Sequence, residues 1–459
     1  METVNAGLEN AGKKLRLTAT LGEVADINPE RLGSEWSLSY ILYVDISSVG
    51  EGHISTSPAK LDLDEAPSRA QRIISEWDVV LSTVRPNRRA MFQARDVQQG
   101  TVVSTGFAVL RAKPGQIDPR YLYALVFDQS FTDYLVMREQ GAAYPAVSPS
   151  DIAEAEVSLP PIEEQRRIGH ILGTLDDKIE LNRRMSATLE EMARALYKSW
   201  FIDFDPVIDK AILAGNPIPK ELESKAERRR AYWAKTTPDG RPKPLASDLD
   251  SLFPDSFQDS TLGPIPSGWA VASFGRVCQN VGRSVAPAQI DPEEVYVGLE
   301  HIAPKSLCLN EWGAGKEVSS QKSRFLQDEI LFGKLRPYFH KVSIAPLAGI
   351  CSTDVLVLDA TDKRWWAYVA LASSEESTIE YVTATSGGTR MPRTSWSDLD
   401  RMPVVLSPLG SAEAFGDIIR PVLKRLQPIS SESRVLATIR DSLLGPLLQG
   451  QLKMVVQNQ

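Results

Sequence analysis

The most regular hydrophobic pattern of the chain follows Pro160 and Pro161. Apolar or small residues recur there at alternating steps of four and three, namely at Ile168, Leu172, Leu175, Ile179, Asn182, Ser186, Leu189, Ala193 and Leu196. Such a heptad seam, entered through Pro161 and acidic residues in the first turn, predicts an amphipathic helix over residues 162–198. At 1.5 Å per residue this helix would be roughly 55 Å long, which suits a rigid spacer. Asn182 within the seam would cost stability and fix the register of a paired helix.

A second seam with the same spacing lies in residues 409–452. Its positions are Phe415, Ile419, Val422, Leu426, Ile429, Ser433, Leu436, Arg440, Leu443 and Leu447. Ser433 and Arg440 interrupt the seam, and prolines at 421, 428 and 446 predict a broken helix rather than one continuous rod. Because both seams follow equivalent parts of a repeat, we expect the two helical segments to pack against each other in antiparallel orientation.

The repeat itself lies in β-rich sequence. Residues 78–112 and 328–360 both run from an acidic residue through an apolar strand to Arg-Pro, a basic and aromatic turn, a second strand, Ser-Thr and a third strand. Arg85 and Pro86 correspond to Arg336 and Pro337. A tandem repeat of this size predicts two similar modules, which suits a protein that reads two similar targets.

Short β-rich runs separated by Gly, Pro and Ser predict a mixed α/β architecture for each module. In the first copy these runs are residues 40–45, 79–84 and 102–110, and residues 119–140 follow with helical spacing. Residues 202–262 form a linker with a charged patch and a Pro/Asp/Ser-rich run. Parts of this linker are apolar enough that we expect it to wrap a partner or the second module.

Composition narrows the function classes. The chain has 459 residues, 42% of them hydrophobic and 24% charged, which is typical of a soluble globular protein of two or three domains. No apolar run approaches the roughly 20 residues that span a bilayer, and the first residues lack a signal-peptide pattern, so no membrane association is expected. Three cysteines without a C-x-x-C pair argue against disulfides and structural zinc and favour the cytoplasm.

The net charge of −8 argues against avid, non-specific nucleic-acid binding by the chain alone. Local basic loops remain compatible with DNA reading if partner subunits supply the remaining positive surface. Catalytic patterns are absent: there is no phosphate-binding loop, and the four histidines are scattered. The Asn-Pro-Ile-Pro run at 216–219 lacks the aromatic residue that would stack on an extruded base. We therefore predict a chain that is not an enzyme, with no catalytic residue and no metal site.

Two pairs of loops are the best candidates for DNA contact. The turn after the repeated strand offers donors and acceptors for base edges and phosphates: Arg85, Asn87, Arg88 and Arg89 in the first copy, and Arg336, Tyr338, His340 and Lys341 in the second. A Gly-containing loop further along offers Tyr144 and Ser148 in the first copy, and Thr389, Arg390 and Arg393 in the second. Taken alone, the residues of the first pair would also be explained by solvated charged hairpins, and those of the second pair by ordinary turns. Since the copies differ in side chain, the two modules should read different sequences.

Several segments together resemble a known family. They are LPPIEEQRRIGHILGTLDDKIELNRRM at 159–185, FIDFDP at 201–206, GPIPSGW at 263–269 and LRPYFHK at 335–341. They resemble the specificity subunit of Type I restriction-modification enzymes, over essentially the whole chain. The resemblance implies an α/β fold with two similar mixed α/β target recognition domains, separated by two long antiparallel helices in a coiled coil with a pseudo-twofold internal repeat.

The predicted boundaries follow from the patterns and the resemblance. They are recognition domain 1 at 1–160, a central spacer helix at 161–201, a linker and central region at 202–262, recognition domain 2 at 263–408 and a C-terminal spacer helix at 409–454. Each domain is expected to read half of a bipartite double-stranded DNA target, with the helices setting the gap.

The resemblance also implies the partners. Two modification subunits would carry S-adenosylmethionine and methylate adenine, and two restriction subunits carrying ATP and Mg²⁺ for translocation and cleavage can join them. No cofactor is expected on this chain itself. Two alternatives stay open: a specificity subunit of a fused restriction-modification system without a motor, and a coiled-coil scaffold that binds only protein.

Overall fold

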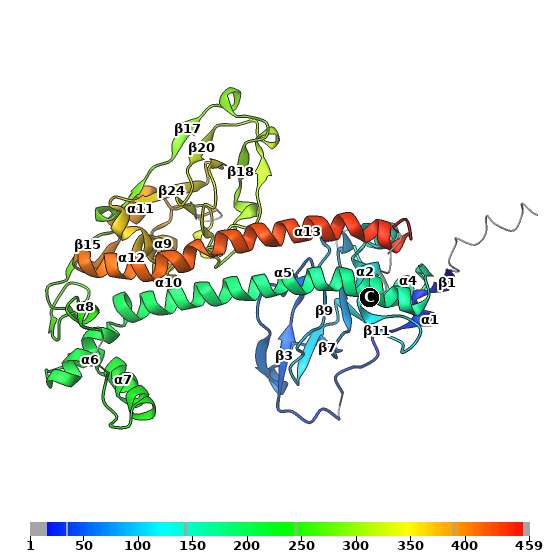
Figure 1. The fold of residues 1–459 in the computed structure, drawn as a ribbon, viewed down its shortest axis with the longest axis horizontal. Coiled ribbons are helices and arrows are strands. Elements are labelled where there is room, and N and C mark those ends of the chain that lie inside the picture. The colour runs from blue at the N-terminus through cyan, green and yellow to red at the C-terminus, as the bar shows by residue number, and fades with distance from the viewer. Residues whose placement is uncertain (1–15, 34, 142–144, 244–245, 389–390, 453–459) are drawn as a thin grey trace, which may run out of the picture. The chain divides into compact units, whose positions relative to one another are not determined.

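The computed structural model describes residues 16–452 apart from residues 34, 142–144, 244–245 and 389–390. The chain folds as two compact units, one formed by residues 1–180 with 435–459 and the other by residues 181–434 (Figure 1). We call them unit 1 and unit 2. No helix within the described ranges is long and apolar enough to cross a membrane.

Besides a short hairpin of β4 (Val49–Gly50) and β5 (His53–Ile54), unit 1 is built on two four-stranded sheets and a two-stranded ribbon. The strand order of one sheet is β2 (Ala25–Ile27), β11 (Phe107–Ala112), β8 (Val79–Ser82) and β9 (Met91–Gln93), all antiparallel. The order of the other is β6 (Ala59–Asp62), β3 (Tyr40–Val44), β10 (Thr101–Ser104) and β7 (Ala70–Ile73), with β10 parallel to β3. The ribbon pairs β1 (Leu17–Thr20) with β12 (Glu156–Leu159). The apolar run 102–110 is therefore two strands, because a turn at Thr105 and Gly106 separates them.

The first of these sheets is buried on both faces. Along β11, Ala108 and Leu110 join one hydrophobic cluster, whereas Phe107 and Val109 join another. Side chains of a strand alternate between faces, so an uninterrupted apolar run is what a two-sided core requires. This explains why the repeated strands read as continuous hydrophobic sequence.

The helical stretch expected over residues 119–140 is two helices, α2 (Pro119–Phe127) and α3 (Gln129–Val136). Asp128 separates them in extended conformation, and its carboxylate accepts a hydrogen bond of 2.9 Å from the backbone N–H of Ser130. An Asp that caps a new helix offers its carboxylate to amides that a continuing helix would use internally. Periodicity alone did not reveal this break.

Helix α5 (Ile162–Tyr197) confirms the predicted 162–198 helix. In unit 1 its first half packs against the end of α13 (Leu426–Leu448), with Leu172 and Leu444 in one hydrophobic cluster. Arg440 donates to Asp176 over 2.8 Å. Residue numbers rise along one helix as they fall along the other, so this pairing is antiparallel, as expected.

Unit 2 repeats the topology of unit 1, with one additional edge strand in its second sheet. Its sheets have the orders β16 (Cys278–Asn280), β24 (Val355–Ala360), β21 (Ile330–Gly333), β22 (Val342–Ile344), and β17 (Arg283–Val285), β20 (Lys322–Phe325), β23 (Gly349–Cys351), β18 (Val295–Val297), β19 (Gly313–Ala314). A ribbon pairs β15 (Ala270–Ser273) with β25 (Pro403–Leu406). Parallel pairing of β18 with β23 matches that of β3 with β10, so the sequence repeat is a fold repeat.

The helices of unit 2 follow the same plan. α9 (Trp366–Ser373) and α10 (Glu376–Thr385) correspond to α2 and α3, and α11 (Trp396–Arg401) precedes the final strand. The second spacer segment is broken at Arg425 into α12 (Leu409–Lys424) and α13, as its prolines predicted. Pro421 lies inside α12 and Pro446 lies inside α13, whereas the break falls between the two helices.

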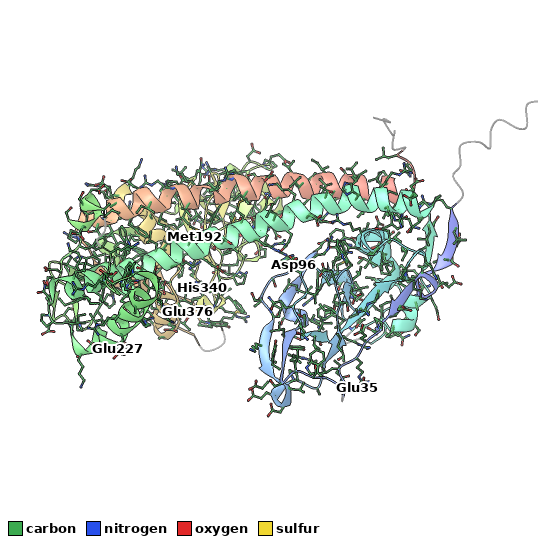
Figure 2. The ribbon with its side chains drawn as sticks, turned by 60° about the horizontal axis from the view of Figure 1, so that its bottom comes forward. Glu35, Asp96, Met192, Glu227, His340 and Glu376 are labelled. Atoms are coloured by element: carbon green, nitrogen blue, oxygen red, sulfur yellow. The ribbon has the colours of Figure 1, made fainter. Side chains whose placement is uncertain are left out.

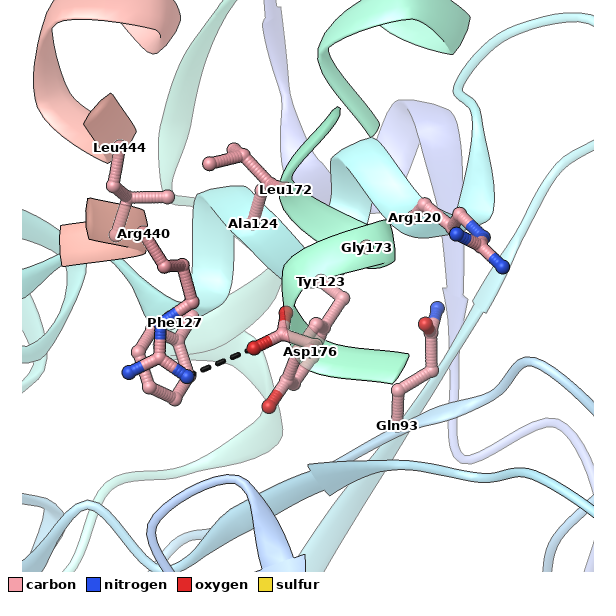
Figure 3. Close-up of a pocket in the computed structure, with 10 residues that line it drawn as sticks. All are labelled: Gln93, Arg120, Tyr123, Ala124, Phe127, Leu172, Gly173, Asp176, Arg440 and Leu444. Carbon is pink, nitrogen blue, oxygen red and sulfur yellow. Dashed lines mark hydrogen bonds and ion pairs between the residues drawn. The ribbon is translucent and has the colours of Figure 1, made fainter. Parts of the chain in front are cut away.

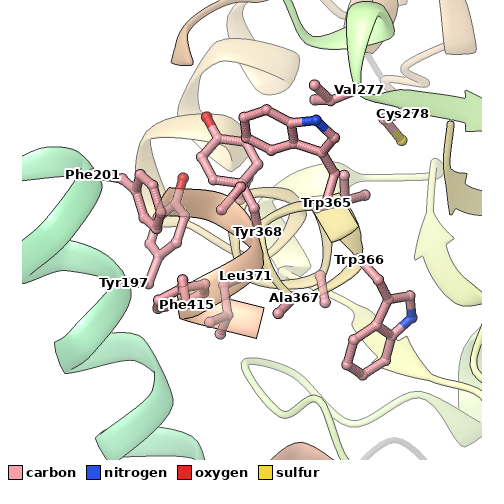
Figure 4. Packing of buried hydrophobic residues seen from close by; sticks show 14 of the residues in the cluster. Tyr197, Phe201, Val277, Cys278, Trp365, Trp366, Ala367, Tyr368, Leu371 and Phe415 are labelled. Carbon is pink, nitrogen blue, oxygen red and sulfur yellow. The ribbon is translucent and has the colours of Figure 1, made fainter. Parts of the chain in front are cut away.

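The segment after α5 packs into the core of unit 2. It contains a π-helical turn (Lys198–Ile202), α6 (Asp205–Ala214), α7 (Glu223–Thr236) and α8 (Ser247–Asp250). Phe201 lies edge-on against Tyr368 and Phe415, with ring centroids 5.0 Å apart in both pairs (Figure 4). Phe204 and Phe253 of the linker lie in the same hydrophobic cluster as Trp269 and Phe274, so of the two expected possibilities the linker packs on the second module.

A polar contact lies within the helix seam of unit 2. The Nδ2 atom of Asn182 donates to Glu432 over 2.8 Å and to the Ser433 hydroxyl over 3.2 Å, and the Asn182 side chain is fully buried. A buried amide that finds its partner at only one register favours that register over slipped ones. Further along α5, the Glu190 carboxylate accepts from the backbone N–H of Leu307 over 2.8 Å, which ties a loop of unit 2 to the helix.

Candidate nucleic-acid interface

Each unit presents the same short turn after the same strand. Residues Pro86–Arg88 follow β8, and residues Pro337–Phe339 follow β21, each as one 3-10 turn. Both turns are bounded by left-handed residues: φ is 50° at Arg85 and 52° at Arg89, and 50° at Arg336 and 53° at His340. Left-handed backbone is costly for side chains of this size, and strain retained in both copies points to a functional constraint.

The two candidate loops of each unit are neighbours. The backbone N–H of Arg85 donates to the carbonyl of Pro145 over 2.8 Å, and that of Arg336 donates to Pro392 over 2.7 Å. Isolated β-bridges join Val84 to Ala146 and Leu335 to Arg393. The structure thus brings together, in each unit, a turn and a loop that lie more than fifty residues apart in the sequence. We call this combination the loop pair.

The last residue of each turn is held inside its own unit. The Arg89 guanidinium donates to the Phe127 carbonyl at the end of α2 over 2.6 Å, to Thr132 over 2.8 Å and to Glu51 over 2.7 Å. The His340 ring lies 2.9 Å from the carbonyl of Ser374 at the end of α9 and 3.5 Å from Glu376 (Figure 2). A donor at a helix C-terminus satisfies carbonyls that have no partner within the helix. We therefore assign Arg89 and His340 a positioning role, which the sequence alone did not distinguish from DNA contact.

Burial lowers the pKa of two residues at the turn of unit 2, His340 and Lys341. It lowers the pKa of His340 below its usual range, against smaller opposing effects of the Ser374 carbonyl and Glu376. The neutral ring therefore donates one hydrogen bond to Ser374. Burial also lowers the pKa of Lys341, whose Nζ donates to the carbonyl of Leu299 over 2.6 Å. Lys341 is thus also engaged within unit 2.

The middle of each turn is exposed. Asn87 and Arg88 face solvent in unit 1, and Tyr338 and Phe339 do so in unit 2. Arg393 is also exposed and forms an ion pair with Asp354 at 3.3 Å. Phe339 carries an exposed aromatic ring at a position that sequence reasoning did not select. Its place in the middle of the repeated turn was the available signal.

The remaining candidates have mixed outcomes. Arg85 and Arg336 are partly buried at the base of the turns. Ser148 is exposed at the start of α4 (Pro149–Ala153), where its hydroxyl accepts from the N–H of Asp151 over 3.1 Å. Tyr144, Thr389 and Arg390 lie outside the described residues.

A pocket of unit 1 lies away from the loop pair. It is lined by α2, α5 and α13, and contains the Arg440–Asp176 ion pair, with the Arg440 guanidinium 4.3 Å from the centre of the Phe127 ring (Figure 3). Burial raises the pKa of Asp176, and Arg440 opposes this effect. This ion pair joins α13 to α5 within the helix seam. Among the described residues, no three His, Cys, Asp or Glu side chains gather to hold a metal ion.

Comparisons with known proteins point to one family. The model of the Type I restriction modification DNA specificity domain matches residues 69–191. Over this segment the chain is similar to the Type I restriction-modification specificity subunits. The match spans the segment from β7 to α5, including the turn of unit 1, and unit 2 repeats the same topology.

Similar curated proteins are specificity subunits by name. The chain is 25% identical to the Type I restriction enzyme HindI specificity subunit of Haemophilus influenzae, over 85% of this chain and 90% of that protein. It is 23% identical to the MjaIX specificity subunit of Methanocaldococcus jannaschii, over 76% of this chain and 72% of that protein. Among solved structures, the S subunit of a Type-I restriction-modification system from M. genitalium aligns over 98% of this chain and 99% of that one, with 14% identity and a TM-score of 0.49.

Proposed function

We propose that this chain is the DNA specificity subunit of a Type I restriction-modification complex, in which each unit reads one half of a bipartite target. The observation that carries the proposal is the duplicated loop pair. Its backbone is the same in both units, down to the left-handed residues at each end, while the exposed side chains differ. Two loop pairs with the same backbone and different exposed side chains suit two domains that read different DNA sequences.

The side chains of the loop pairs fit this role. Asn87 can pair with adenine and Arg88 with guanine through two hydrogen bonds in the major groove. Ser148, Arg336 and Arg393 supply donors for phosphates near the same loops. Tyr144, Thr389 and Arg390 remain proposed contacts from the sequence.

The spacing of the half-sites is proposed to depend on the paired helices. α5 is one uninterrupted helix of 36 residues, about 54 Å long, and it contributes to the core of both units. Half-sites about one helical turn apart, roughly 34 Å, face the same side of the duplex. The partnered Asn182 amide supports a single register for the pairing, and hence a single preferred gap.

The proposed partners are two modification subunits with S-adenosylmethionine, to which two restriction subunits with ATP and Mg²⁺ can be added. The chain itself is proposed to be non-catalytic and cytoplasmic. An outer face of α5 in unit 2 supports subunit binding, because Leu181 and Met192 are exposed there with partly buried Met185 between them. These positions repeat at steps of four and seven, which leaves an apolar stripe open to a partner helix.

The decisive test combines the chain with modification subunits and maps methylated adenines on random duplex DNA. We expect one bipartite motif with a fixed gap. Replacing the first recognition domain by that of another specificity subunit should change one half-site and leave the other half and the gap unchanged. A complex that assembles but methylates without sequence preference would favour the protein-only scaffold. Cleavage without separate motor subunits would favour the fused, motor-less system.

A further inference from the structure

The turn of unit 2 carries an exposed apolar cluster. Tyr338 is 50% exposed and Phe339 is 45% exposed, and their ring centroids lie 4.8 Å apart. Met391, on the adjoining loop, is 59% exposed. Three large apolar side chains of unit 2 are thus about half exposed to solvent.

The two positions of unit 1 that are equivalent to the aromatic pair are polar. Asn87 replaces Tyr338 and Arg88 replaces Phe339, on a turn of the same length and the same backbone conformation. The difference between the two turns is therefore one of chemistry at the tips, and the shape of the turn does not require it.

The aromatic pair contributes little to the fold of unit 2. The turn is fixed by other residues: Pro337 and His340 are buried, and the Arg336 N–H is bonded to Pro392. Neither Tyr338 nor Phe339 belongs to a hydrophobic cluster of the described residues. Exposed aromatic side chains that the fold does not need mark a binding surface.

The surroundings of the pair favour a nucleic acid as its occupant. The guanidinium of Arg336 lies 5.9 Å from the centre of the Phe339 ring, and Arg393 is bridged to the strand residue before Arg336. Aromatic rings flanked by arginines suit bases whose backbone the cations neutralise.

We propose that Tyr338 and Phe339, assisted by Met391, form a stacking element that inserts against an unstacked base step in the half-site read by unit 2. At the two positions equivalent to the aromatic pair, unit 1 has Asn87 and Arg88, which would read its half-site by hydrogen bonds. This assignment rests on the proposed function. Methylation of adenine requires that the base leave the stack, which exposes the faces of its neighbours. An aromatic ring can cover such a face whatever the base is.

The test uses the full chain assembled with its modification subunits and duplexes that carry the mapped motif. The variants are Tyr338→Ala with Phe339→Ala, and Phe339→Trp. The matched control is Asn87→Ala with Arg88→Ala in unit 1. 2-Aminopurine is placed beside the target adenine in one half-site at a time, because its fluorescence reports whether its face is covered.

We expect the double alanine variant to weaken binding about 10- to 100-fold and to raise 2-aminopurine fluorescence only in the half-site of unit 2. Phe339→Trp should retain binding and quenching. The control variant should relax base preference in the other half-site without changing fluorescence there.

Two results would overturn the stacking assignment. One is equal behaviour of wild type and the double alanine variant in the half-site of unit 2. The other is a loss of affinity, on replacing thymine by uracil, as large as that of the variant, because the rings would then contact a methyl group in the groove. Failure of the wild-type complex to prefer any sequence would instead refute the proposed function.

Discussion

The two repeated turns solve one structural problem with different residues. At the end of the turn in unit 1, Arg89 bonds to the carbonyl of Phe127, to Thr132 and to Glu51. At the same place in unit 2, buried His340 contacts the carbonyl of Ser374. Both side chains reach the end of the first helix that follows the sheet. The comparison teaches that the position, between a strained turn and a helix end, is constrained, whereas the residue that fills it is not.

The largest effect should come from breaking the core of one unit only. Phe415→Ala removes a ring packed against Tyr197, Trp200 and Phe201, and should destabilise unit 2 by about 3–5 kcal/mol. Hydrogen exchange should show faster opening of β21 and β24 with little change in β8 and β11. The control is Ile418→Ala, which truncates an exposed apolar side chain on the same helix. It should leave the exchange rates of both units unchanged. Equal loss in both units would contradict their separate cores.

Arg89 and Arg88 separate positioning from reading. Arg89→Ala leaves the Phe127 carbonyl and Thr132 without their charged donor and should destabilise unit 1 by about 2–3 kcal/mol. Arg88→Ala, at an exposed neighbour, should change the free energy of unfolding by less than about 0.5 kcal/mol while altering half-site preference. Denaturant unfolding and methylation mapping check the two outcomes. A stable Arg89→Ala protein with altered base preference would make Arg89 a reader instead.

Acid should distinguish the turns as well. The pKa of His340 is lowered by burial from the ordinary value of 6.5, so the folded state binds its proton less readily than the unfolded state. The contribution of neutral His340 is complete above the ordinary pKa, falls as pH drops through the interval down to the folded pKa, and levels off below it. Glu376 opposes this shift, whereas Arg194 and Lys305 reinforce it.

Unit 2 should therefore lose stability as pH falls below about 6.5, and His340→Gln should remove that part of the pH dependence. The turn of unit 1 has an arginine at this place and should lack it. Thermal unfolding between pH 5 and 7.5 measures the difference. Identical pH profiles for wild type and His340→Gln would show that the ring does not titrate with folding.

The smallest effect concerns the helix caps beside the loop pairs. The Ser148 hydroxyl caps α4 by accepting from the backbone N–H of Asp151, whereas at the start of α11 the Ser395 hydroxyl donates to the Asp398 carboxylate over 2.7 Å. Ser148→Ala should cost about 1 kcal/mol in unit 1, measured by chemical denaturation. Ser150→Ala, two residues further along, removes a hydroxyl that lies 2.8 Å from that of Ser148 but does not cap the helix, and it serves as the control. A larger loss for Ser150 than for Ser148 would contradict the capping assignment.

Much of this architecture was readable from the sequence because it depends on local periodicity. The helix of residues 162–197 carries its heptad spacing openly, and Arg-Pro marks both turns. The break at Asp128 could not be read, because an Asp favours a cap only when the next turn begins there. The role of Arg89 could not be read either, since it depends on a helix end almost forty residues away. The tip residues at 87, 88, 338 and 339 were visible as a repeat, but their exposure required the fold.

The most direct measurement copies the tip of the unit 2 turn onto the turn of unit 1. Asn87→Tyr with Arg88→Phe places the aromatic pair of unit 2 on the frame of unit 1, and the assembled complex is then tested by methylation mapping. We predict that the half-site of unit 1 changes its preferred bases while the other half-site and the gap stay as they were. An unchanged motif, or a change in both halves, would contradict the account of one frame with two interchangeable tips.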